Sequence, residues 1–221
     1  MIRLVDVVKR YPQSGEALSG VSLDIGAGEM VYLTGHSGAG KTTLLRLLAG
    51  LEACTSGQVI VGGKNVGRMS ATVLPHYRRR VGLVFQDHKL LPDRSVFDNV
   101  ALPMVIAGAP TRDVRSRVRA ALERVGLGER EAHFPTTLSS GEQQRVGIAR
   151  AVVSRPPILL ADEPTGNLDP TLSREVMSLF RDFNQLGTTV VIATHELALI
   201  DALPTRSVQL RQGRCVDDGF A

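Results

Sequence analysis

One eight-residue segment limits the fold of this chain more than any other. Residues 35–42 read GHSGAGKT, fit the pattern G-x-x-x-x-G-K-[ST], and lie between the strand-like run MVYLT and a helix-like run. The glycines let backbone N–H groups point at phosphate oxygens, while Lys41 reaches the β- and γ-phosphates and the Thr42 hydroxyl can ligate Mg²⁺. An accidental glycine-rich turn is the alternative, and the strand–loop–helix context argues against it. We therefore expect a nucleoside triphosphate bound to an α/β core.

Polar side chains stand at the ends of three further apolar runs. The run ILLADE ends in Asp162, whose carboxylate can hold Mg²⁺, and in Glu163, which is suited to polarise an attacking water. Gln86 ends VGLVFQ, and His195 ends VVIATH. Ligands of open α/β sheets bind at the carboxyl ends of the strands, so all these groups are expected to face the phosphates. Each could be a structural residue if taken alone, but their shared position favours a functional site.

Strand-like and helix-like runs divide the chain into an α/β core and a helical insertion. Strands are predicted at IRLVDVV, ALSGVSLDI, MVYLTG, QVIVGG and VGLVFQ. The pattern is helical from about residue 95 to 154, most clearly after Pro110. Strand and helix then alternate through ILLADE, TLSREVMSLFRDFNQLG, VVIATH and ELALIDAL, and the tail reads as a hairpin turning at Gln212-Gly213. We expect one domain over residues 1–221, with its core at 1–86 and 155–221 and a helical lobe at 87–154.

The composition is that of an ordinary globular protein. Hydrophobic residues make up 43% of the 221 residues, and the net charge of +4 is too small by itself to argue for nucleic acid. No stretch approaches the roughly 18 apolar residues that span a bilayer, and the start of the chain alternates like a strand rather than a signal peptide. Cys54 and Cys215 have no neighbouring Cys or His to complete a metal set, which is typical of thiols in a reducing compartment. We expect a cytosolic chain.

A second anion site is predicted a hundred residues after the first. In TLSSGEQQRVGIARA, residues 137–151, Ser139 and Glu142 have the spacing of a capping box at the start of a helix. Free N–H groups and the helix dipole favour an anion at such an end. The sequence therefore predicts two phosphate-binding elements in one chain.

Taken together, these motifs resemble the ATPase subunit of ATP-binding cassette (ABC) systems. GHSGAGKT, LSSGEQ, ILLADE, NLD and ATH occur in the family's order and approximate spacing, and the match weakens only after about residue 206. The resemblance implies an α/β fold, with a RecA-like P-loop NTPase core, an N-terminal antiparallel β subdomain and an inserted α-helical lobe. It also implies ATP and Mg²⁺ as cofactors, and an ATPase that forms ADP and phosphate.

The resemblance also implies roles for single residues. Tyr11, which could instead only pack at the end of the first strand, would stack on adenine. Glu163 would be the catalytic base, His195 would contact the γ-phosphate, and Asp169 would communicate across a dimer. Gln86 would sense Mg²⁺ and a membrane partner, and the metal would be held by Thr42, Gln86 and Asp162. The phosphate-loop residues carried over as nucleotide contacts are Gly35, His36, Ser37, Gly38, Ala39, Gly40, Lys41, Thr42 and Thr43.

The family resemblance also implies a role for the second anion site. The resemblance implies a head-to-tail homodimer formed on ATP binding, in which Ser139 and Gly141 of one copy contact the ATP held by the phosphate loop of the other. The sequence departs from the common L-S-G-G-Q pattern at Ser140 and Glu142. The Ser140 hydroxyl could add a donor, but its Cβ could crowd the nucleotide. Glu142 brings negative charge near a triphosphate unless it folds back onto the helix end.

Within the family, several stretches resemble the cell-division branch most closely. They are His36 in the phosphate loop, FQDHKLLPDRSVFDNVALP, IAGA and SGEQQRVGIARAVV. This implies a polytopic, FtsX-like membrane partner and a peripheral position on the cytoplasmic face of the bacterial inner membrane. It also implies a role in controlling cell-wall hydrolysis, and no nucleic acid among the partners. Lipoprotein-releasing and macrolide-export ATPases are the alternative. A DNA-repair or chromosome-organising ATPase head would need long coiled-coil arms, and a GTP switch would need N-K-x-D; neither feature is present.

Two surfaces are candidates for contact with the membrane system. Residues 87–105 contain Leu90, Leu91, Val96, Phe97 and Leu102, and this stretch is expected either to dock a cytoplasmic helix of the membrane partner or to pack in the core. The arginines of residues 112–124 and of YRRR at 77–80 could approach anionic lipid headgroups or form a solvated face.

Overall fold

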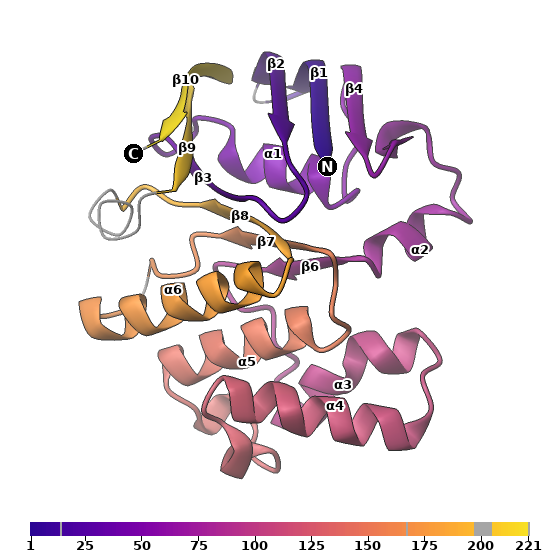
Figure 1. The fold of residues 1–221 in the computed structure, drawn as a ribbon, viewed down its shortest axis with the longest axis vertical. Helices are drawn as coiled ribbons and strands as arrows, with labels where there is room; N and C mark the ends of the chain where they lie inside the picture. Colours follow the sequence, from indigo (N-terminus) through magenta and orange to yellow (C-terminus); the bar gives the residue numbers. More distant parts are fainter. Residues whose placement is uncertain (14, 167, 197–204, 221) are drawn as a thin grey trace.

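The computed structural model describes residues 1–13, 15–166, 168–196 and 205–220, and its N-terminal part is an antiparallel sheet. This sheet has the strand order β2-β1-β4-β5 (Figure 1). Its strands are β1 (Ile2–Tyr11), β2 (Gly15–Ile25), β4 (Ser56–Val61) and β5 (Lys64–Asn65). Buried residues alternate with exposed ones along β2, as in a sheet with one face on the core. The N-terminal antiparallel β subdomain expected from the family resemblance is therefore present.

The second sheet is mainly parallel and carries the phosphate loop. Its strand order is β10-β9-β3-β8-β7-β6, with antiparallel pairing only between β9 and β10. Its strands are β3 (Met30–Thr34), β6 (Val81–Val84), β7 (Ile158–Asp162), β8 (Thr189–Ala193), β9 (Arg206–Arg211) and β10 (Arg214–Phe220). The central strands β3 and β8 are buried at every position, so their sequences are continuous apolar runs.

The parallel sheet separates two hydrophobic clusters. In β3, Val31 and Leu33 pack with the antiparallel sheet and with α1 (Lys41–Leu48). The alternate residues Met30 and Tyr32 pack on the opposite face, where α6 (Pro170–Gln185) and the helical lobe lie (Figure 1). This arrangement follows from the two-residue period of a strand, which sends successive side chains to opposite faces. One sheet thus fixes both the phosphate loop and the lobe.

The helical lobe lies between β6 and β7 in the chain. It contains α3 (Val96–Ile106), α4 (Thr111–Arg124), α5 (Ser140–Val152) and two 3-10 turns at Gly128–Arg130 and Pro135–Thr137. The fully buried Val118 and Leu122 lie one turn apart on α4, which confirms the helical period read from the sequence. A short helix, α2 (Leu74–Arg78), and a 3-10 turn, Val66–Arg68, connect β5 to β6. None of the helices in the described part of the chain is long and apolar enough to cross a membrane.

Most predicted elements are present, and two need comment. The C-terminal hairpin turns at Gln212 and Gly213, both with positive φ, as expected. Strand β6 ends at Val84, two residues before the expected end at Gln86, because the chain turns there and the His88 N–H donates to the Phe85 carbonyl at 3.2 Å. The predicted helix at ELALIDAL falls largely on residues 197–204, which lie outside the described residues.

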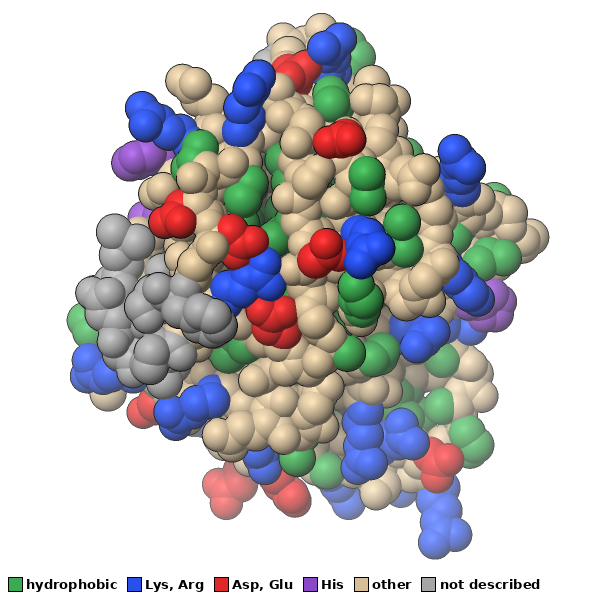
Figure 2. All heavy atoms as spheres, turned by 45° about the horizontal axis from the view of Figure 1, so that its top comes forward, with side chains coloured by type: hydrophobic (Ala, Val, Ile, Leu, Met, Phe, Trp, Pro, Cys, Tyr) green, Lys and Arg blue, Asp and Glu red, His purple; other side chains and the backbone are tan. Residues whose placement is uncertain are grey.

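Charges of both signs are mixed on the face that carries the antiparallel sheet and the C-terminal hairpin (Figure 2). Ion pairs join neighbouring strands there, with 2.6 Å between Arg3 Nε and Asp24 Oδ1 and 2.6 Å between Arg206 Nε and Asp218 Oδ1. The small positive excess of the sequence is therefore not gathered into a single basic patch on this face.

Candidate active site

The phosphate loop runs from the end of β3 to the start of α1, and its shape requires glycine at two positions. Gly35 has φ +141°, and a Cβ there would collide with the Leu210 carbonyl oxygen. Gly40 has φ +106°, and a Cβ would lie 2.6 Å from the Ala17 carbonyl oxygen. Both glycines therefore allow the loop to pass close to neighbouring backbone. The loop presents the N-terminus of α1, which has no side-chain cap, toward the cavity described below.

Lys41 is buried at the first position of α1. Its Nζ donates to the Gly35 carbonyl at 2.7 Å and lies 3.3 Å from Glu163 Oε1. The side chain is only 7% exposed, and a buried charge is costly unless it is paired. The Glu163 carboxylate and backbone oxygens supply that pairing. A cation in this position can turn to an anion bound over the loop.

Two adjacent carboxylates follow β7 and point to different partners. Asp162 Oδ1 accepts a hydrogen bond from Thr42 Oγ1 at 3.1 Å, and burial raises the pKa of Asp162 above its usual range. Glu163 Oε2 lies 2.8 Å from His195 Nδ1. Glu163 has φ +47°, a left-handed conformation that is rare outside glycine.

A single cavity of about 640 Å³ collects most of the predicted nucleotide-binding residues. It is lined by Tyr11, Glu16, Ala17, His36, Ser37, Gly38, Ala39, Gly40, Lys41, Thr42, Thr43, Gln86, Glu163 and His195. The structure thus brings the catalytic candidates and the phosphate loop together. Glu16 and Ala17 were not predicted; they line the cavity because the start of β2 passes close to the loop at Gly40, and no local sequence signal marks that contact.

Tyr11 and Gln86 both line this cavity. The Tyr11 hydroxyl donates to Glu52 Oε2 at 2.6 Å, and Lys9 Nζ lies 4.9 Å from the centre of its ring. Gln86 is exposed, just beyond the end of β6. The Tyr11 side chain is thus held in the cavity lining by polar contacts.

Helix α5 begins with the predicted capping box. Ser139 Oγ accepts a hydrogen bond from the Glu142 N–H at 3.2 Å, and the Ser139 N–H donates to Glu142 Oε2 at 2.9 Å. This backbone hydrogen bond holds the pKa of Glu142 below its usual range, and Arg130 lies 3.4 Å away. Glu142 therefore folds back onto the helix end, and its charge is engaged there.

The other signature residues lie outside the phosphate-loop cavity. Ser140 is exposed at the first position of α5. Gly141 is buried against α6, and a Cβ there would collide with the Leu172 side chain. Asp169 caps α6, and its Oδ1 accepts hydrogen bonds from the N–H groups of residues 171 and 172 at 2.9 and 3.1 Å. Neither Ser139, Gly141 nor Asp169 lines the cavity that holds Lys41.

A set of polar contacts ties α5 to the segment after Gln86, and sequence reasoning missed it. Arg150 donates to the carbonyl oxygens of His88 and Lys89 at 2.5 and 2.7 Å. His88 Nδ1 lies 2.5 Å from Oε1 of the buried Gln144. His88 and Lys89 have φ values of +58° and +49°, so this left-handed turn is held by the helix. We call these contacts the α5 latch.

The residues around Thr42 and Asp162 suit Mg²⁺. A hydroxyl and a carboxylate oxygen 3.1 Å apart are hard oxygen ligands, and the half-buried Asp162 lies beside the loop that would hold the phosphates. The described residues contain no cluster of three or more His, Cys, Asp or Glu side chains that could hold a metal.

Comparison with known proteins identifies the family. A sequence model of the ABC transporter family matches residues 18–166, and the chain belongs to this family. It is 51% identical to the "Cell division ATP-binding protein FtsE" of Escherichia coli K12 over 213 residues, 96% of each chain. The FtsE of Bacillus subtilis 168 is 42% identical over 218 residues, which is 99% of this chain and 96% of that one.

A solved structure agrees with these relatives. The ATP-binding cassette MJ0796, in a dimeric post-hydrolysis state bound to ADP and Pi, has a TM-score of 0.92 and 33% identity, and the match covers 100% of this chain and 98% of that one. The expected ABC ATPase fold is confirmed, and the chain is an ATP-hydrolysing subunit of this family. Of the branches considered from the sequence, the FtsE relatives confirm cell division over export.

Proposed function

We propose that this chain drives an ABC-type complex of bacterial cell division from the cytoplasmic face of the inner membrane, together with a polytopic, FtsX-like membrane subunit. Residues 1–86 and 155–221 form its nucleotide-binding core, and residues 87–154 form the lobe that joins it to the partner. The observation that carries the proposal is the cavity in which the phosphate loop, Glu163 and His195 meet. The FtsE names of its relatives support the cellular role.

In this proposal the phosphate loop binds the triphosphate through its N–H groups, and Lys41 turns from Glu163 to the phosphates. A triphosphate carries several negative charges and competes well for a buried lysine. Glu163 is then free to accept the proton of a water that attacks the γ-phosphorus, while the bond to the leaving ADP oxygen breaks. His195 holds Glu163 in place and lies at the γ-phosphate.

Thr42, Asp162 and Gln86 would hold Mg²⁺, which supplies charge neutralisation on the β- and γ-phosphates when bound. The Thr42–Asp162 hydrogen bond fixes these two ligands beside the loop. Tyr11 would stack on the adenine at the rim of the same cavity. Asp169, at the start of α6, would transmit the state of one site to a second copy.

The signature end of α5 serves the ATP of a second copy in this proposal. Ser139 and Gly141 do not line the cavity of their own chain. Because the Ser139 N–H is used by Glu142, the donors for the ATP of another copy would be the Ser139 hydroxyl and the Gly141 N–H. A γ-phosphate with free oxygens can bind a second helix N-terminus and join two copies, and hydrolysis removes that contact. The engaged Glu142 carboxylate leaves the helix end favourable to an anion.

The stretch 87–105 is the proposed docking surface for the membrane subunit. Val96 is fully buried, so it belongs to the core, and Leu90 and Phe97 pack partly against the core. Leu91 is 39% exposed and offers the apolar contact. Charged substitution at Leu91 is therefore the selective test of this surface.

The experiment is co-purification of the chain with an FtsX-like subunit from membranes. Leu91→Glu should reduce the recovered complex by about 10-fold, the scale of losing one central apolar anchor. Val216→Glu, at an apolar residue of β10 that is 52% exposed, should leave recovery unchanged. Binding of ATP by both variants shows that they are folded. Normal recovery of folded Leu91→Glu would place the docking surface elsewhere.

A further inference from the structure

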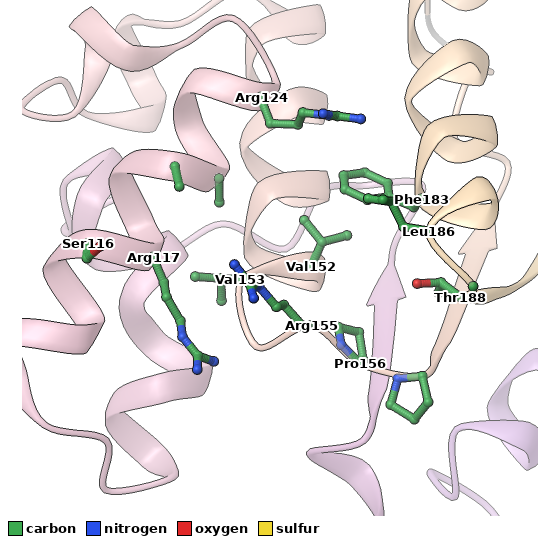
Figure 3. Close-up of a pocket in the computed structure, with 14 residues that line it drawn as sticks. Ser116, Arg117, Arg124, Val152, Val153, Arg155, Pro156, Phe183, Leu186 and Thr188 are labelled. Carbon is green, nitrogen blue, oxygen red and sulfur yellow. The ribbon is translucent and has the colours of Figure 1, made fainter.

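A second cavity of the described residues lies away from the ATP site. This groove has a volume of about 680 Å³ and shares no lining residue with the cavity around Lys41 (Figure 3). One wall comes from α4, and the opposite wall comes from the C-terminal end of α6, with the turn between α5 and β7 at the base. We call it the α4–α6 groove. Its size is within the range of sites that bind small molecules or peptide side chains.

One side of the groove is apolar and unusually accessible. Leu186 is 75% exposed, the largest fraction of any large hydrophobic residue in the described ranges. Phe183 and Val152 lie beside it and are only partly buried against the core. Pro156 and Pro157 extend this surface and offer no N–H donors. A single exposed leucine is ordinary, but one at the rim of an apolar groove is placed to contact a ligand.

The other side of the groove is basic. Arg117 projects from α4, and Arg155 projects from the α5–β7 turn; Figure 3 shows both side chains on the α4 side of Phe183 and Leu186. Within the described residues, neither guanidinium has a carboxylate within ion-pair distance or a hydrogen-bond partner. Arg124 differs, because its Nη2 lies 3.2 Å from Asp182 Oδ2 and joins α4 to α6. Two guanidinium groups are thus available to an anionic ligand.

Arg155 occupies a position where the backbone favours another residue. Its φ of +52° is left-handed, and glycine or asparagine adopts that conformation with less strain. The turn itself needs no arginine, because its own hydrogen bond runs from the Arg155 N–H to the Val152 carbonyl at 2.8 Å. The side chain therefore adds charge to the groove without a visible part in holding the turn.

We propose that the α4–α6 groove binds an acidic, amphipathic peptide segment of another protein. Carboxylates of the segment pair with Arg117 and Arg155, since planar guanidinium groups bind carboxylates in bidentate fashion. Apolar side chains of the segment pack on Phe183 and Leu186. Arginine and aromatic residues are enriched in protein interfaces for this combination of charge and area. A peptide with acidic and apolar faces meets both walls along its length, whereas a phospholipid carries its charge at one end.

The test uses random 12-residue peptides displayed on phage and selected on the full-length chain. The R117Q/R155N variant serves for counter-selection, because asparagine suits the left-handed backbone at residue 155. The control is R112Q/R211Q, which removes the same charge from exposed arginines outside the groove. Selected peptides are synthesised with a fluorescent label, and their Kd values are measured by anisotropy.

We expect peptides that combine Asp or Glu with Leu or Phe. Their Kd should rise by about 10-fold or more in R117Q/R155N and by about 5-fold in Leu186→Ser, the scale of losing interface anchors. The Kd of the peptides for the control R112Q/R211Q should stay within about twofold of the wild-type value. ATP turnover of all variants should be unchanged, since none of these residues lines the ATP cavity.

Four results would overturn the proposal. Selection could yield no peptide that prefers the wild-type chain to R117Q/R155N, or peptides without acidic residues. Equal affinity for the wild type and R117Q/R155N would place binding elsewhere. Co-sedimentation with phosphatidylglycerol vesicles that depends on Arg117 and Arg155, without peptide binding, would assign the groove to lipid. If R117Q/R155N does not fold, Arg117→Gln alone replaces it, with an expected rise in Kd of about 3-fold.

Discussion

Glu163 divides its two carboxylate oxygens between Lys41 and His195. The Lys41 contact of 3.3 Å neutralises a buried lysine, and the His195 contact of 2.8 Å orients the carboxylate toward the cavity. The same side chain thus has a structural partner and a partner suited to catalysis. The backbone at residue 163 is left-handed, a strained conformation of the kind that clusters at functional sites.

Replacement of Glu163 should separate hydrolysis from binding. Glu163→Gln should slow ATP hydrolysis by about 10²-fold or more, because an amide cannot take the proton of the attacking water. ATP affinity should stay the same or increase. Lys41→Ala should instead weaken ATP binding. Turnover is measured with purified proteins free of contaminating ATPase, and near-normal turnover by Glu163→Gln would remove Glu163 from this role.

Glu142 provides a prediction for pH. Its pKa is lowered in the folded chain, so its stabilising contribution is present above its ordinary pKa near 4.5 and is lost as pH falls through the folded value. Glu142→Gln should reduce the free energy of unfolding by about 0.5–1 kcal/mol at pH 7, since the glutamine keeps the cap but loses the charge at the helix end.

Urea unfolding of Glu142→Gln and wild type at pH 7 and pH 3 checks this prediction. The difference between them should become smaller at pH 3 than at pH 7, because the wild-type carboxyl takes up a proton as the pH falls through its lowered pKa. Glu129→Gln, at an exposed residue, is the control and should show little change at either pH. A difference of the same size at both pH values would contradict the assigned charge effect.

At the scale of elements, α5 connects two functional segments. Its N-cap is Ser139, and about three turns later Arg150 of the α5 latch holds the chain that follows Gln86. Burial lowers the pKa of Arg150, and its guanidinium is matched to two carbonyl oxygens. We therefore expect a shift of the segment after Gln86 to move the signature end of the helix.

Arg150→Met should test this link. We expect hydrolysis to fall by about 10-fold while ATP affinity changes by less than about 3-fold, and we expect a loss of about 2 kcal/mol in stability from two unmade charged hydrogen bonds. Arg150→Lys should restore activity only partly, because lysine lacks the planar fork. The control is Arg119→Met, which breaks the exposed ion pair with Glu131. Equal kcat for Arg150→Met and wild type, with reduced stability, would leave Arg150 a structural role only.

The sequence predicts elements better than contacts between them. Strands β3, β7 and β8 are continuous apolar runs, and the capping box of α5 is local, so short-range patterns are sufficient for both. The α5 latch joins residues about 60 positions apart. The left-handed turn at His88 and Lys89 contains no glycine from which it could be predicted. Contacts of this kind depend on tertiary packing, which local propensity does not encode.

At the scale of the whole molecule, the sequence predicts two anion-binding helix ends, and only the end at the phosphate loop lines the cavity around Lys41. The phosphate loop and Glu163 meet at one edge of the parallel sheet, while α5 belongs to the lobe (Figure 1). Sequence motifs predict the residues of both ends, but motif order alone cannot tell whether they act in one chain. This division is the physical basis for the proposed head-to-tail dimer.

Mixing two inactive variants should restore activity if the dimer forms in this way. Lys41→Ala damages a phosphate loop, and Ser139→Arg damages a signature end by bulk and charge. In a mixed dimer both defects fall in one site, and the second site is wild type. We expect ATPase activity on mixing to exceed that of either variant by about 10-fold, provided that one intact site can turn over. Recovery shows that the signature acts on another chain's ATP.

The most direct measurement is a structure of the Glu163→Gln protein with ATP bound. The account predicts a dimer in which Ser139 and Gly141 of one copy contact the γ-phosphate that Lys41 of the other copy holds. A γ-phosphate contacted by Ser139 and Lys41 of the same chain would contradict it.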